Sequence, residues 1–156
     1  PVACVVGCID SRVPPELVLG QRLGDIFAAR VAGNFVNTDI IGSLEFATKL
    51  AGAKVIVVLG HTECGAIKGA VDDAKLGNLT ATLANIRPSL TKLNYSAMPS
   101  SKNKELVQRV ADQNARDAAA NLTAKSEVLS ELVTEGKLKI VSGMYDISTG
   151  RVSWFG

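Results

Sequence analysis

Two kinds of hydrophobic pattern alternate along the chain, and together they predict an α/β fold. Four runs dominated by apolar residues predict the strands of a parallel sheet, and the first of them is a continuous apolar run typical of a strand buried on both faces. These runs cover residues 2–9, 25–31, 54–59 and 138–145. A tight turn at 148–150 leads into 151–155, a short last strand that such a turn makes antiparallel. We therefore expect a mostly parallel central sheet, with four parallel strands and a short antiparallel C-terminal strand, flanked by helices.

The segments between these strands carry apolar residues at helical spacing, which predicts the helices that cover the sheet. Asp39 is the expected N-cap of a helix that ends at Gly52, and Ser126 is the expected N-cap of a helix over 127–135. Further helices are expected over 16–19, 64–76 and 79–86, and over a longer stretch whose apolar stripe runs from Leu106 to Leu122.

Proline and polar residues mark a break before this long helix. Pro88 is expected to terminate the helix over 79–86, because the proline ring removes a backbone donor and clashes with the preceding turn. Residues 89–104 contain Pro99 with several Ser and Asn residues. We expect them to form a surface loop.

Length and charge narrow the class of protein. The 156 residues are enough for one globular domain with a real core, and the net charge of +2 comes without a basic block that could neutralise a run of phosphates. No run of eighteen uncharged apolar residues is present, and no secretory signal opens the chain. We expect a soluble protein with no nucleic-acid or membrane partner, in the cytoplasm or, if a signal segment precedes this chain, in the periplasm.

The counts of histidine and cysteine are more restrictive. With one histidine and three cysteines, a three-histidine zinc site, an H-E-x-x-H helix and a complete disulfide framework are all excluded. Cys4 and Cys8 lie on one predicted strand, roughly 13 Å apart at about 3.3 Å per residue, which is too far for a disulfide. We therefore interpret Cys4 as a small buried hydrophobic residue.

Polar residues of specific kinds stand where two buried strands end. The segment 7–12 reads Gly-Cys-Ile-Asp-Ser-Arg and the segment 60–65 reads Gly-His-Thr-Glu-Cys-Gly. The carboxyl ends of neighbouring strands meet at one crevice, which would bring Cys8, His61 and Cys64 together as the ligands of a catalytic zinc site with an open fourth position. A histidine followed by a nearby cysteine is more often simple packing, but the second cysteine at another strand end favours the metal.

Asp10 and Arg12 lie two residues apart just past the first strand. Taken alone, they are as well explained by a structural ion pair. Beside a metal, a carboxylate held by a guanidinium can orient a metal-bound water or can itself fill the open coordination position.

These segments resemble the paired sequence signature of the β-class carbonic anhydrases. The resemblance includes residues 30–34, 42–47 and 136–150 and extends from Val2 to about Trp154. It implies zinc held by Cys8, His61 and Cys64, an Asp10–Arg12 dyad, and reversible hydration of carbon dioxide to bicarbonate and a proton by zinc-bound hydroxide. It also implies a substrate pocket lined by Phe27, Ala32, Phe46 and Gly65.

Further expectations follow from the resemblance, from a departure from it and from the chemistry of the ligands. The chain would form a single zinc domain over 1–156 without the N-terminal helical arm of the family, and it would pair into a homodimer or a dimer-based tetramer. Because two thiolates reduce the charge of zinc, the bound water would be less acidic than on zinc with neutral ligands. We therefore expect activity to rise with pH, with Asp10 as a fourth zinc ligand that closes the site at low pH.

Two alternatives to carbonic anhydrase activity remain open from the residues. The same scaffold could hydrolyse carbon disulfide or carbonyl sulfide, because a zinc hydroxide attacks any small linear electrophile that reaches it. The other alternative is a non-catalytic assembly module, in which Asp10 permanently completes a closed structural zinc site.

Overall fold

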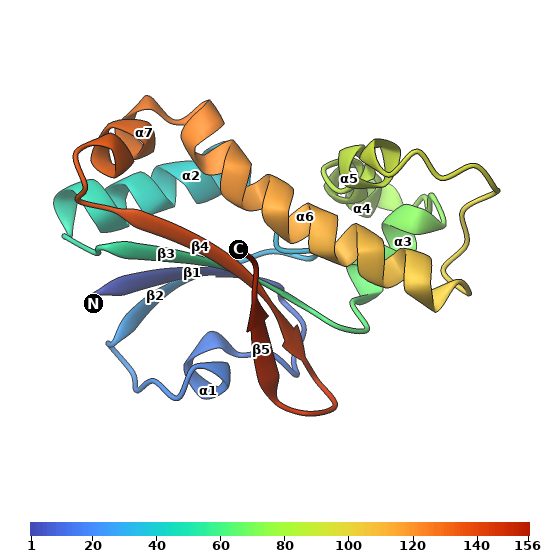
Figure 1. The fold of residues 1–156 in the computed structure, drawn as a ribbon, viewed down its shortest axis with the longest axis horizontal. Coiled ribbons are helices and arrows are strands. Elements are labelled where there is room, and N and C mark those ends of the chain that lie inside the picture. Colours follow the sequence, from blue (N-terminus) through green and yellow to red (C-terminus); the bar gives the residue numbers. More distant parts are fainter.

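One five-stranded sheet organises the chain, in the order β2-β1-β3-β4-β5 (Figure 1). In the computed structural model, which describes residues 1–156, the first four strands are parallel and the last pairs antiparallel with its neighbour. This confirms the predicted sheet. The strands are β1 (Ala3–Gly7), β2 (Ile26–Arg30), β3 (Val55–His61), β4 (Lys139–Asp146) and β5 (Arg151–Trp154).

The two faces of the sheet are covered unequally. Figure 1 shows α2, α6 and α7 along one face, whereas the other face carries only the short α1 and the turn from β4 into β5. None of the helices has the length and apolar character needed to cross a membrane. The helical elements are α1 (Pro15–Val18), α2 (Thr38–Glu45), the π-helical η1 (Phe46–Leu50), α3 (Gly65–Val71), α4 (Gly77–Ala84), α5 (Arg87–Lys92), α6 (Lys104–Lys125) and α7 (Glu127–Thr134).

Alternation along the central strands divides the core between these two faces. On β1, Cys4 and Val6 pack into the cluster under the helices, while Val5 belongs to the cluster on the opposite face, which includes Val18 of α1. All three β1 side chains are fully buried. A strand buried on both faces must be apolar at every position, which explains the continuous hydrophobic run.

Several details of the helices differ from the expectations. Asn37, and not Asp39, caps α2, because its side chain accepts a hydrogen bond from the amide of Ile40 at 3.0 Å. The first predicted helix after β3 already ends at Val71, where the expectation was residue 76.

Pro88 begins a helix and does not end one. It occupies the first turn of α5, where the missing amide has no helical partner to lose and the fixed φ suits the helix. The expected loop over 89–104 is therefore wrong for residues 89–92, which are helical.

Candidate metal centre

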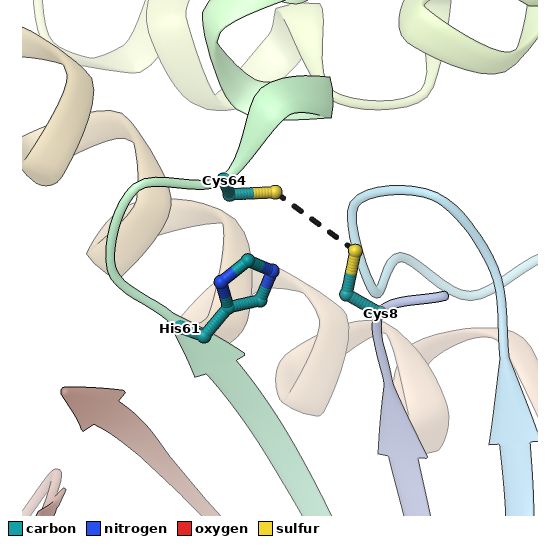
Figure 2. Close-up of side chains that lie close together, drawn as sticks. All are labelled: Cys8, His61 and Cys64. Atoms are coloured by element: carbon teal, nitrogen blue, oxygen red, sulfur yellow. Dashed lines mark hydrogen bonds between the residues drawn. The ribbon is translucent and has the colours of Figure 1, made fainter. Parts of the chain in front are cut away.

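Strand order brings the predicted ligands together. β1 and β3 are adjacent parallel strands, so their carboxyl ends open at the same edge of the sheet. Cys8 follows β1 directly, His61 is the last residue of β3, and Cys64 is the N-cap residue of α3. Figure 2 shows the three side chains converging from these elements. The predicted juxtaposition is confirmed.

The three side chains form a compact and buried donor set. The Sγ atoms of Cys8 and Cys64 lie 4.0 Å apart, and the ligand atoms of Cys8, His61 and Cys64 all lie within 4.8 Å of one another. Each residue is at most 4% exposed. Two sulfurs and one imidazole nitrogen are donors that zinc prefers.

The imidazole of His61 is oriented so that one of its nitrogens has no hydrogen-bond partner. His61 Nδ1 lies 2.8 Å from the carbonyl oxygen of Thr62, to which the protonated Nδ1 donates, while Nε2 is buried without a hydrogen-bond partner. A buried nitrogen without a partner costs free energy. A metal ion at this position would remove that cost, so the residues present fit zinc.

The two thiols share one hydrogen bond, and this separates their proton affinities. The hydrogen bond with Cys64 lowers the pKa of Cys8 to about 4, although burial opposes the shift, and the same hydrogen bond together with burial raises the pKa of Cys64. Burial also lowers the pKa of His61, but the nearby Cys8 sulfur and Thr62 carbonyl more than offset it. Metal binding would therefore displace protons from this group.

Asp10 and Arg12 form a closely held pair beside the donor set. The Nε and Nη2 atoms of Arg12 donate to the two carboxylate oxygens at 2.9 and 2.7 Å, and its backbone amide donates to Oδ1 at 2.8 Å. These hydrogen bonds hold the pKa of Asp10 well below its usual range. Its Oδ2 lies 3.8 Å from Nε2 of His61, and Arg12 also donates to the carbonyl of Glu63 at 3.0 Å. The pair thus joins both predicted segments.

Two supporting residues are not found by reasoning from residue types and spacing. Arg30, at the end of β2, donates to the carbonyl oxygens of Cys8 and Asp10, each at 2.7 Å. Asn114, in the middle of α6, is 2% exposed and donates to the carbonyl of Gly33 at 2.6 Å. A charged residue at the end of the strand beside β1 and a buried amide inside an apolar stripe are the signals that could have found them.

The structure divides the predicted pocket residues into two places. Ala32 precedes the turn that touches Cys8, and Gly65 follows Cys64 with open space where a side chain would stand. Phe27 and Phe46 form an edge-to-face pair, with ring centroids 6.4 Å apart, on the edge strand and the start of η1. Phe27 lies opposite Cys4 in the sheet register, so within one chain this pair is remote from the donor set.

Comparisons with known proteins agree with this architecture. A family model described as carbonic anhydrase matches residues 3–152. Carbonic anhydrase 2 of Mycobacterium tuberculosis is 34% identical over 97% of this chain and 72% of its own length. The solved β-carbonic anhydrase CafA of Aspergillus fumigatus superposes with a TM-score of 0.86, at 29% identity, over 99% of this chain and 75% of that one. A tetrameric β-carbonic anhydrase of Sordaria macrospora gives 0.87, at 28% identity, over 100% and 81%. From sequence and structure alike, the chain belongs to the carbonic anhydrase family and, within it, to the β class.

Proposed function

We propose that this protein uses zinc, held by Cys8, His61 and Cys64, to hydrate carbon dioxide reversibly to bicarbonate and a proton. The observation that carries the proposal is the buried donor set, in which an unpartnered imidazole nitrogen and two sulfurs lie within 4.8 Å of one another. Membership of the carbonic anhydrase family supports the same reaction.

The donor set supplies three ligands, which suits catalysis. Structural zinc sites are closed by four protein ligands, whereas catalytic sites have three and keep a position for water or substrate. When bound, zinc supplies a Lewis acid that lowers the pKa of a coordinated water towards neutrality. Two thiolates and a neutral imidazole would hold it, with Nδ1 of His61 fixed by the Thr62 carbonyl.

Asp10 and Arg12 would orient the reacting water. The lowered pKa keeps the Asp10 carboxylate ionised, so it acts as a hydrogen-bond acceptor 3.8 Å from His61 Nε2. Arg12 fixes both carboxylate oxygens and prevents the group from rotating freely. With no second histidine in the chain, the released proton must leave through water, buffer or carboxylates.

Phe27 and Phe46 would serve the substrate pocket of a second copy of the chain. The rings lie away from their own donor set, and Phe46 is 56% exposed beside the open edge of β2. Apolar side chains of this kind would provide the surface on which carbon dioxide rests. We therefore propose a homodimer or a dimer-based tetramer, in line with the tetrameric relative from Sordaria macrospora.

The non-catalytic alternative requires Asp10 to be a permanent fourth ligand. Both of its oxygens accept hydrogen bonds from Arg12, and it is not among the residues whose ligand atoms lie within 4.8 Å of one another. This pairing favours the orienting role over the structural one.

Metal content and turnover, measured together, test the proposal. The wild-type protein should contain about one zinc per chain and hydrate carbon dioxide in a stopped-flow assay, and Cys64→Ala should lose both. A zinc-loaded wild type without carbon dioxide turnover would overturn the proposal. Parallel assays with carbon disulfide and carbonyl sulfide distinguish carbonic anhydrase activity from the alternative hydrolase activity. A pH series from about 6 to 9 tests the expected rise in carbon dioxide hydration with pH.

A further inference from the structure

A buried polar side chain interrupts the apolar stripe of α6. Asn114 is 2% exposed and lies next to Ala115, with Ala111 and Ala118 one turn away on either side, all of them core residues. A buried amide is costly unless it is hydrogen-bonded. Its Nδ2 donates to the carbonyl oxygen of Gly33 at 2.6 Å, across 81 positions of sequence. An apolar residue at position 114 could cover the sheet equally well, so packing alone does not explain the asparagine.

The residue that accepts this bond also touches a predicted metal ligand. The amide of Gly33 donates to Sγ of Cys8 at 3.4 Å, so one residue connects Asn114 to the thiolate. An amide donor aimed at a sulfur stabilises its charged form, which is the form that binds a metal.

The turn that presents this amide depends on tertiary contacts. Gly33 and Asn34 both have positive φ, at 88° and 42°, and a Cβ at Gly33 would collide with Ile86. Glycine is required here, but glycine is also the residue with the greatest backbone freedom. The hydrogen bond from Asn114 fixes the Gly33 carbonyl and thereby limits that freedom.

Arg30 completes the support on the other side of Cys8. It donates to the carbonyl oxygen of Cys8, while Gly33 donates to the sulfur of the same residue. The segment 30–34 therefore holds Cys8 at two atoms, and Asn114 is the contact that anchors the glycine end of this segment to α6.

We infer that Asn114 is a positioning residue for the metal centre: acting through Gly33, it keeps an amide donor on the Cys8 sulfur and so strengthens zinc binding. The inference rests on the proposed zinc site. It assigns Asn114 no contact with substrate and no part in proton transfer.

Asn114→Leu tests this inference, because leucine has a similar volume and no donor. We expect zinc affinity, measured by competition with a chelator, to fall about tenfold, as is typical when a supporting hydrogen bond of a ligand is removed. Asn121→Leu is the matched control, since Asn121 lies two turns further along α6 and makes no side-chain hydrogen bond there. Its affinity should remain that of the wild type.

A spectroscopic measurement separates positioning from general stability. In protein loaded with cadmium-113, the Gly33 amide proton should show scalar coupling to the metal through the Cys8 sulfur, and Asn114→Leu should weaken it. Affinity within about twofold of wild type together with unchanged coupling would overturn the inference. If Asn114→Leu does not fold, Asn114→Ser replaces it, and absence of the coupling in the wild type would overturn the inference without any variant. A wild type that binds neither zinc nor cadmium would instead refute the proposed zinc site.

Discussion

Two cysteines, Cys4 in β1 and Cys8 directly after it, show how differently the two ends of the sheet are built. Cys4 is 0% exposed and Cys8 is 4% exposed, so burial alone does not distinguish them. At Cys4, burial raises the pKa of the thiol to about 11, whereas at Cys8 the hydrogen bond with Cys64 lowers it to about 4. The contacts around each sulfur therefore decide its chemistry.

The surroundings of the two sulfurs explain this difference. The cluster around Cys4 consists of apolar residues such as Leu44, Ile56 and Leu122, with no polar partner for the thiol. Around Cys8 stand a second thiol, an imidazole nitrogen without a partner and the amide of Gly33. One end of the sheet is organised for stability, and the other leaves polar groups in place for a ligand.

The largest expected effect comes from replacing Cys8 with alanine, and the same replacement at Cys4 is its control. Cys8→Ala should lose zinc and reduce carbon dioxide hydration by about 10³-fold or more, because the Lewis acid supplies several kcal/mol of transition-state stabilisation. Cys4→Ala should retain both. Zinc content and stopped-flow rates are measured for both variants. Equal losses of zinc and of turnover in the two variants would contradict the distinction between the two ends of the sheet.

Arg12→Ala should give the next largest effect. Without the guanidinium, Asp10 loses its orientation, and we expect the turnover number to fall about 10²-fold while the zinc content stays unchanged. Arg22→Ala is the control, since Arg22 also pairs with an aspartate, at 3.5 Å, but precedes β2, whose first residue pairs with Ala3 at the end of β1 away from Cys8. Turnover of Arg12→Ala equal to that of Arg22→Ala would contradict the orienting role.

Leu122→Ala tests the contribution of the apolar cluster around Cys4 to stability. This side chain is fully buried in the cluster that contains Cys4, so its truncation should lower the free energy of unfolding by about 2–5 kcal/mol. Urea denaturation of the metal-free protein measures the loss. Zinc affinity of the folded variant should be unchanged, and a large fall in affinity would show that the two ends are coupled.

The smallest effect is expected at Asp117, a carboxylate that contributes to stability and has no part in the proposed zinc site. Burial raises the pKa of Asp117, but hydrogen bonds from Lys92, Ser89 and Gln113 lower it by more. A folded-state pKa below the unfolded value contributes stability above about pH 4, which is lost as pH falls through the folded pKa. Asp117→Asn should therefore destabilise by about 1 kcal/mol at pH 7 and by less near pH 3.

Thermal or urea unfolding at the two pH values checks this sign. Zinc content and turnover of Asp117→Asn should match the wild type, in contrast to variants of Asp10. A destabilisation that is the same at pH 3 and pH 7 would show that the charge of Asp117 contributes nothing.

Local sequence patterns predicted most of the fold and failed where neighbours in space decide. Ser126 was predicted as the N-cap of α7 and is confirmed, because capping depends on residues three positions apart. The same reasoning predicted Asp39 as the cap of α2, where the structure has Asn37, because both residue types cap helices and the path of the chain into the helix decides between them. Pro88 was predicted to end a helix because proline breaks a helix interior, but proline is also tolerated in the first turn of a helix, which is where the structure places it.

The chain itself determined the parallel sheet and the donor types at two strand ends. The spacing of apolar residues is a local property of the sequence, and it predicts the strands and helices. One histidine and three cysteines leave few possible sets of metal ligands. Only the tertiary structure decided that Nε2 of His61 is left without a partner, that Arg12 spans both segments and that Asn114 supports Cys8 through Gly33. The hydrogen bonds of Arg12 and Asn114 join residues about 50 to 80 positions apart, and no local pattern encodes which distant groups will share a hydrogen bond.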